Sequence, residues 1–162
     1  MKKNVFHIAI LLLALTAFHC SSPSRSTTSG KTEIITETII PNTATKSFQK
    51  ELAGTWNVLS MRRQAKAKQE TLSGVSLTFN EQDNKFNGKA PCNSIFGTVQ
   101  LNGYSIRFQE VGATRMACDK MEQETAYLEL LQNRISSFSI EGSKLYLKDV
   151  ASNIVLECER AK

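Results

Sequence analysis

The chain has 162 residues and a formal net charge of +5 from 20 basic and 15 acidic residues, and it contains 4 cysteines and 2 histidines. A mild positive excess of this size gives no indication of nucleic-acid binding, for which a basic stripe is expected. Both histidines, His7 and His19, lie in a leader that we expect to be removed, so Ser-His-Asp catalysis, Cys-His catalysis and histidine-ligated metal sites are excluded from the mature chain.

Residues 1–19 have the features of an export signal. Two lysines follow Met1, and an apolar run extends over residues 8–18. This run is too short to remain as a membrane span, which needs about 20 apolar residues to cross a hydrocarbon core of about 30 Å. The run ends in Leu-Thr-Ala-Phe-His-Cys, whose last residue is Cys20, and this sequence resembles the lipobox of bacterial lipoproteins.

The lipobox resemblance implies that residues 1–19 are a lipoprotein signal peptide and that Cys20 is acylated, with palmitate among the attached chains. The alternative is ordinary cleavage that leaves Cys20 as a free thiol. No acidic run follows Cys20, so nothing resembles a tag for export to the cell surface. We therefore expect a bacterial envelope protein that is held by its lipid anchor, most simply in the outer membrane, and that faces the periplasm.

A flexible tether is predicted over residues 20–49. Ser and Thr make up 13 of the 29 residues from Ser21 to Gln49, and no aromatic residue precedes Phe48. Such a segment buries too little apolar surface to offset the entropy lost on ordering. Within it, Ile34–Ile40 is rich in β-branched residues and could instead dock as an edge strand on the domain or on a partner.

Residues 50–162 are predicted to form a β domain. Apolar residues there alternate with polar ones in short runs, which is typical of half-buried strands. Asn102-Gly103 predicts a two-residue hairpin turn, Glu141-Gly142 a weaker one, and residues 80–84 a polar loop. The expected topology is an antiparallel meander. The alternating positions are Trp56 and Val58, Leu77 and Phe79, Val99 and Leu101, Ile106 and Phe108, Phe138 and Ile140, Leu145 and Leu147, and Ile154, Leu156 and Cys158.

One helix is predicted at about residues 119–135. Its apolar residues recur at helical spacing, with Asp119 as the expected N-cap and Glu122 as its partner in a capping box. A single helix among seven or eight strands predicts a curved sheet or small barrel that the helix covers on one face or at one end. The stripe consists of Met121, Leu128, Leu131 and Ile135, widened by Leu130.

Three motifs in this part of the chain are distinctive: Leu52–Trp56 (LAGTW), Asn87–Gly97 (NGKAPCNSIFG) and Ala113–Cys118 (ATRMAC). In this order, and followed by the predicted helix, they resemble the META domain family, also called the heat-shock HslJ-like family. The resemblance covers about residues 52–158. It implies a small lipocalin-like β-barrel with a helix, and the family commonly occurs as small bacterial lipoproteins. Its links to heat shock, stress tolerance and motility imply no defined activity.

The same resemblance implies a disulfide between Cys92 and Cys118, which the oxidising compartment expected after export would permit. Cys158 alternates with Leu156 and Ile154, so we expect it to be a buried thiol in the core. A pair that uses Cys158, or three reduced thiols, are the alternatives. A catalytic role for Cys92 or Cys118 is not expected, since the mature chain would lack a histidine base.

The candidate contacts for a ligand or partner are Asn93, Phe96 and Arg115. For Asn93 the structural interpretation is a left-handed turn or a bond to its own backbone, and for Arg115 it is an ion pair with Glu110 or Glu122. Gly88 and Gly97 are expected to bracket a loop or bulge, because the spacing fits no phosphate-binding loop. The residues Met116 and Met121 are most simply core residues.

These observations favour a non-enzymatic binding or adaptor protein of the cell envelope, with an apolar ligand or an envelope protein as its partner, no nucleic acid and no cofactor. The first alternative is a purely structural, stress-protective domain whose interior is filled by Trp56, Phe79, Phe108 and Phe138. The second is a glycan hydrolase of the cell wall that uses paired carboxylates, Glu110 among them, although no acidic pair has a recognisable spacing.

Overall fold

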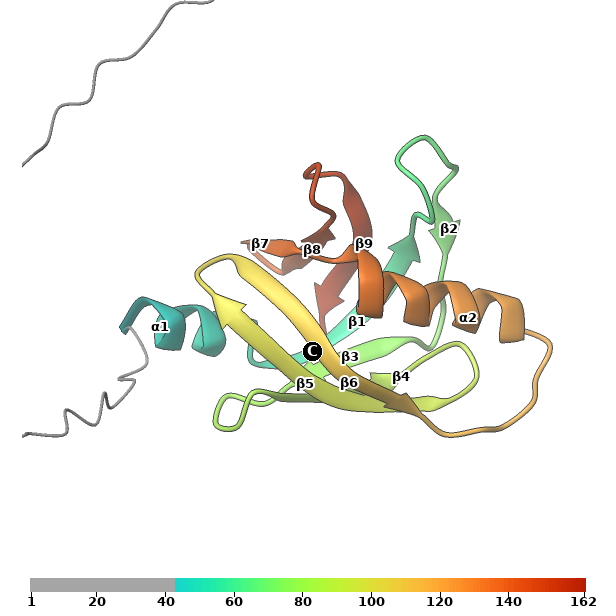
Figure 1. Ribbon diagram of the computed structural model, residues 1–162, viewed down its shortest axis with the longest axis horizontal. Helices are drawn as coiled ribbons and strands as arrows, with labels where there is room; N and C mark the ends of the chain where they lie inside the picture. Colours follow the sequence, from blue (N-terminus) through green and yellow to red (C-terminus); the bar gives the residue numbers. More distant parts are fainter. Residues whose placement is uncertain (1–42) are drawn as a thin grey trace, which may run out of the picture. The chain divides into compact units, whose positions relative to one another are not determined.

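Nine antiparallel strands form the framework of residues 43–162, the part of the chain that the computed structural model describes (Figure 1). The predicted signal peptide, the lipidation site Cys20 and the segment Ile34–Ile40 lie outside these residues. The strands are β1 (Gly54–Met61), β2 (Glu70–Thr71), β3 (Ser76–Phe79), β4 (Lys85–Lys89), β5 (Ser94–Asn102), β6 (Ser105–Ala113), β7 (Ser137–Glu141), β8 (Lys144–Lys148) and β9 (Ile154–Arg160). The helical segments are α1 (Thr43–Leu52), α2 (Met121–Glu129) and the π-helical turn η1 (Leu130–Arg134).

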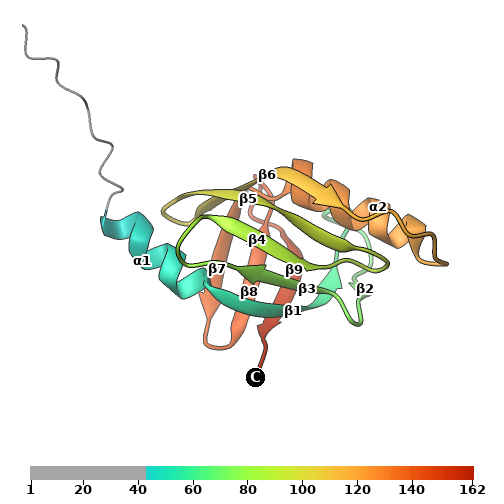
Figure 2. The same ribbon diagram turned by 90° about the horizontal axis from the view of Figure 1, so that it is seen from below.

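The strands follow one another around a ring. Their order is β2-β1-β3-β4-β5-β6-β7-β8-β9, and β9 also pairs with β1, so the sheet returns to its beginning. The ring is not a clean barrel, because β6 and β7 share only the pair Ser105↔Ser137. Beyond that pair the two strands diverge, and α2 lies alongside β6 (Figures 1 and 2). The predicted mainly β fold with a helix is confirmed.

The interior of the ring is filled by side chains from alternate strand positions. Trp56, Phe79, Phe108 and Phe138 are all buried, as the alternation predicted. The rings of Phe86 and Phe108 pack edge to face with their centroids 5.0 Å apart. Burial of such side chains stabilises the fold by about 1.5–3 kcal/mol each. Aromatic side chains therefore occupy the space inside the ring.

The chain forms a strand where the alternation did not indicate one. β4 has a single buried apolar side chain, Phe86, and its other side chains are polar or glycine. It is stabilised by its two neighbours, β3 and β5, which pair with it over its whole length. Gly97 in β5 faces Phe86, and a Cβ at this position would lie 2.8 Å from the carbonyl oxygen of Gln109. The ladder between β5 and β6 shifts register at the same place, so the predicted bulge near Gly97 is confirmed.

Two details of the strands differ from the prediction. The β5–β6 hairpin turns at Gly103 and Tyr104, one residue later than expected, because Asn102 still pairs with Ser105 and Gly103 takes the positive φ of 58°. In β9 the side chain of Ile154 is 39% exposed, whereas Val155 is buried. The register shift between β8 and β9 near Lys148 moves the first residues of β9 to the opposite face, which the alternation could not reveal.

Helix α1 occupies residues that were predicted to belong to the tether, which therefore ends earlier than residue 49. Leu52 is buried, and Phe48 packs on Tyr104 with 4.4 Å between the ring centroids. Arg160 donates hydrogen bonds to the carbonyl oxygens of Ala53 and Glu51 at the end of the helix. The low helix propensity of Ser and Thr is thus outweighed by tertiary contacts of the face that bears Phe48 and Leu52.

The predicted helix at 119–135 is present as α2 and η1, but its beginning differs. Lys120 is the N-cap residue, and no side chain caps the helix. The expected capping box of Asp119 and Glu122 is wrong: Cys118 Sγ accepts the N–H of Lys120, and Glu122 pairs with Arg63 at 2.9 Å. The buried face also differs from the predicted stripe, because Tyr127 is inside whereas Met121 is 43% exposed.

Candidate functional site

A tight turn between β4 and β5 carries the motif residues Cys92 and Asn93. The N–H groups of both residues donate to Glu124 Oε2 of α2, each at 2.8 Å. The Asn93 amide donates to Glu124 Oε1 at 2.6 Å. Glu124 is buried, and these three donors compensate for its removal from water. The turn and the first part of α2 are thereby held together.

Asn93 also fixes the segment that joins β6 to α2. Its Oδ1 atom accepts the N–H of Met116 at 2.8 Å and the hydroxyl of Thr114 at 2.9 Å, and its Nδ2 atom donates to the carbonyl oxygen of Met116. The structure contains the disulfide between Cys92 and Cys118, with 6.1 Å between the Cα atoms. Two of the three sequence motifs therefore meet at a single point, where their polar groups bind one another.

A surface groove of about 650 Å³ lies beside this point. The end of β6 and the segment after it form one wall, and the face of α2 that bears Met121, Glu124 and Leu128 forms the other. Two exposed methionines rim it: Met116 is 65% exposed and Met121 is 43% exposed. Exposed methionine is adaptable and is common at binding surfaces. The residues that line the groove are Asn93, residues 111–117, Met121, Glu124 and Leu128.

The structure brings two of the three candidate contacts to the groove. Asn93 lies at its base and Arg115 lines it. Phe96 is exposed beside it, with its ring over Gly112. Neither form of the structural interpretation of Asn93 is seen. Its φ is not positive, and its side chain bonds Glu124 and the segment from Thr114 to Met116 rather than its own backbone.

Arg115 does not form the ion pair that was expected with Glu110 or Glu122. Glu122 is bound to Arg63, and Arg115 takes part in no ion pair within residues 43–162. The interpretation of Met116 and Met121 as core residues is also wrong. Met116 lies in the segment before α2 and Met121 at the first residue of α2, and both side chains are exposed.

Glu124 is the site residue that the sequence analysis missed. A charged residue is normally assigned to the solvent side of a helix, since a carboxylate is rarely buried without partners. The sequence does contain a signal for its burial. Glu124 lies three residues before Tyr127 and seven before Leu131, which is the spacing of one helix face, and all three side chains are buried.

Two titratable groups in the core lie near each other. Burial raises the pKa of the Cys158 thiol to about 12, with a further contribution from the charge of Glu157. Burial, and to a smaller extent Cys158, also raises the pKa of Tyr127 well above its ordinary value. The Tyr127 hydroxyl has no hydrogen-bond partner in the described part of the chain. The expectation that Cys158 is a buried free thiol is confirmed, and both groups are protonated at neutral pH.

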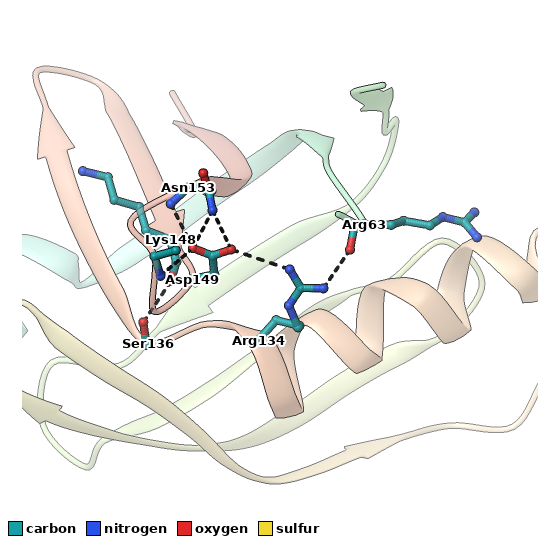
Figure 3. Close-up of polar contacts among 7 residues, drawn as sticks. Arg63, Arg134, Ser136, Lys148, Asp149 and Asn153 are labelled. Carbon is teal, nitrogen blue, oxygen red and sulfur yellow. Dashed lines mark hydrogen bonds and ion pairs between the residues drawn. The ribbon is translucent and has the colours of Figure 1, made fainter. Parts of the chain in front are cut away.

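A second polar cluster anchors the other end of the helix (Figure 3). Arg134 of η1 donates to the carbonyl oxygen of Arg63 at 2.9 Å and lies 3.6 Å from Asp149. Burial alone would raise the pKa of Asp149, but hydrogen bonds from Asn153 and Ala151 and the charge of Arg134 outweigh it and lower the pKa. The cluster joins η1 to the β8–β9 turn and to the loop after β1, so its role is to position the helix.

Metal binding and membrane insertion are two further possibilities for residues 43–162. No group of three or more potential metal-ligating side chains comes together there. No helix in this part of the chain has the length and apolar character of a membrane span. Glu110, the carboxylate considered for glycan cleavage, is exposed and has a φ of 52° at the irregular part of β6.

Comparison with known proteins gives a family and a fold. The META domain model matches residues 49–162. The NMR structure of a protein from Burkholderia xenovorans is similar at 20% identity, with a TM-score of 0.58 and coverage of 82% of this chain and 99% of that one. Another NMR structure is similar at 14% identity, with a TM-score of 0.53 and coverage of 69% and 93%.

A crystal structure of a DUF4847 family protein from Bacteroides vulgatus ATCC 8482 has 16% identity, a TM-score of 0.49 and coverage of 68% of this chain and 94% of that one. No curated protein matches the sequence. At their identities of 20% and 14%, the two NMR structures support the fold alone.

Proposed function

The chain belongs to the META domain family, and from this premise we propose that it is a non-enzymatic binding or adaptor protein of the bacterial cell envelope. In this proposal residues 1–19 are a lipoprotein signal peptide and Cys20 carries the lipid anchor, most simply in the outer membrane. The domain then faces the periplasm and binds an envelope partner.

The observation that carries the proposal is the groove between the end of β6 and α2. Two methionines that rim it are exposed to water, and exposed methionine is common at adaptable binding surfaces. The surrounding contacts are polar and rigid: the disulfide, the Glu124 carboxylate and the Asn93 amide hold both walls. A preformed groove loses little conformational entropy when a partner binds.

A purely structural, stress-protective role is the second candidate. The filled interior favours it, because Trp56, Phe79, Phe108 and Phe138 leave the ring packed with aromatic side chains. A domain with this role would need no partner at the groove. The two candidates therefore differ in whether the exposed methionines contact another molecule in the cell.

Site-specific photocrosslinking in the cell tests the proposal. A photoreactive amino acid replaces Met116 in one variant and Val150, which is 90% exposed in the β8–β9 turn, in a matched control. The binding function predicts a discrete crosslinked product from position 116 that is absent from position 150 and is lost when Met121→Asp is added. Equal products, or none, from the two positions in correctly folded protein would contradict it and favour the structural role.

A further inference from the structure

One edge of β6 lacks a partner strand next to the groove. β7 meets β6 only at Ser105↔Ser137, and β5 pairs with the opposite edge on both sides of the register shift at Glu110 and Val111. The N–H of Thr114 donates to the carbonyl oxygen of Ser94 on the β5 side at 3.0 Å. Successive residues of a strand direct their backbone groups to opposite edges. Ala113 and Val111 therefore direct their N–H and C=O groups away from β5, toward α2.

The backbone groups on this edge are available to a partner. The carbonyl oxygen of Val111 accepts only a long bond of 3.4 Å from Gln132 Nε2. In the described residues no side chain or loop bonds the N–H or C=O of Ala113. Both residues line the groove. An unpaired strand edge of this kind is a template for a further strand.

We propose that the groove accepts an extended segment of a partner protein, which adds to β6 as a further strand along Val111–Ala113. This inference rests on the proposed binding function and names the kind of partner. Backbone hydrogen bonds to β6 would give affinity, and alternate apolar side chains of the segment would lie against Met121 and Leu128. A lipid chain could cover the methionines, but it could not pair with a backbone edge.

Charge adds a second requirement for the segment. Arg115 lines the groove, is exposed, and takes part in no ion pair in the described part of the chain. Glu124, which also lines the groove, is already bound by three donors. The groove is therefore lined by one exposed guanidinium and one buried carboxylic group, and of the two only the guanidinium of Arg115 is free to bind a charged group of a partner. A segment that carries a carboxylate beside its apolar residues would complement it.

The probe is a set of nine-residue peptides, selected from a displayed random library on the full chain with Cys20→Ala. The proposal predicts peptides with alternating apolar residues and one acidic residue. Single N-methylation along a selected peptide should weaken binding about ten-fold at two residues separated by one, those whose N–H groups face Val111 and Ala113, because only one peptide edge faces β6. An N-methyl group at the intervening residue should have little effect.

The protein-side variants are Ala113→Pro and Gln132→Ala. Proline removes the N–H of Ala113, which the β5 ladder does not use, and it should weaken peptide binding about ten-fold. Gln132→Ala frees the carbonyl oxygen of Val111 and should leave binding equal or stronger. If Ala113→Pro does not fold, the N-methylated peptides still test strand addition, because they leave the protein unchanged.

The outcomes separate this inference from the proposed function. Peptide binding that Met121→Asp abolishes, but that shows no two-residue period on N-methylation, would overturn strand addition and leave a binding groove. Peptide binding that Met121→Asp does not affect, or failure to select any peptide, would overturn strand addition. The crosslinking experiment at position 116 would still test the binding function by itself.

Discussion

The buried carboxylate of Glu124 lies 2.6 Å from the side-chain amide of Asn93, 31 residues earlier in the chain. Glu124 also accepts the backbone N–H groups of Cys92 and Asn93, and Asn93 in turn binds the segment before α2. The contact between Glu124 and Asn93 therefore links the motif at residues 87–97 and the motif at residues 113–118 to α2. It sets the position of one groove wall relative to the other.

Glu124→Ala is expected to lower the free energy of unfolding by about 2–4 kcal/mol, because it leaves buried N–H donors without an acceptor. Denaturant unfolding at neutral pH measures it. Glu122→Ala is the matched control two residues earlier in α2: its side chain is 88% exposed and pairs with Arg63, so the loss should stay below about 1 kcal/mol. Equal losses in the two variants would contradict the central role of Glu124.

Reduction of the disulfide is expected to lower the free energy of unfolding by about 3–4 kcal/mol, since Cys92 and Cys118 are 26 residues apart and their bond restricts the unfolded chain. Denaturant unfolding with and without reductant measures the change. In the Cys20→Ala chain, a thiol reagent should label no cysteine of the folded oxidised protein and two after reduction. Labelling of Cys158 in the folded protein would contradict its burial.

Tyr127→Phe is expected to leave the free energy of unfolding unchanged or to raise it by about 1 kcal/mol. The hydroxyl is buried without a hydrogen-bond partner in the described residues, so its removal relieves a desolvation cost while the ring remains in place. Tyr127→Leu provides the contrast, because it removes buried volume and should destabilise the protein. Destabilisation of about 2 kcal/mol or more by Tyr127→Phe would indicate an unseen partner for the hydroxyl.

Asp149 is expected to make the protein less stable in acid. Its pKa is lower in the folded protein than its ordinary value of about 3.9, so its contribution is fully present above that pH and is lost as the pH falls through the folded pKa. Asp149→Asn should destabilise the protein at pH 7 and flatten the decline in stability below about pH 4. Unfolding measured from pH 7 to pH 2 tests this.

The matched control for Asp149 is Asp83→Asn. Asp83 also has a lowered pKa: desolvation would raise it, but the hydrogen bonds and the charge of Lys85 together outweigh that effect. This pair is exposed and screened by solvent, so the control should change the acid profile less. Identical profiles for the two variants would contradict a special role for the Arg134–Asp149 cluster.

The local alternation of apolar and polar residues was sufficient to predict much of the fold. Period-two alternation located most of the strands, including those that carry Trp56 and Phe138, because a half-buried strand requires apolar residues on one face. It could not locate β4, whose pairing comes from its neighbours rather than from its own side chains. It also placed Ile154 on the wrong face, because a register shift depends on the partner strand.

The candidate site was predicted less completely, for a related reason. The sequence by itself determined the motifs, the family they resemble, the cysteine pair that the resemblance implies, and the buried thiol of Cys158. Only the tertiary structure decided that Glu124 is inside and Met121 outside. Burial of a carboxylate is favourable only where backbone donors converge on it, and those donors come from a turn 31 residues away. The groove exists because that distant contact sets how α2 lies against β6.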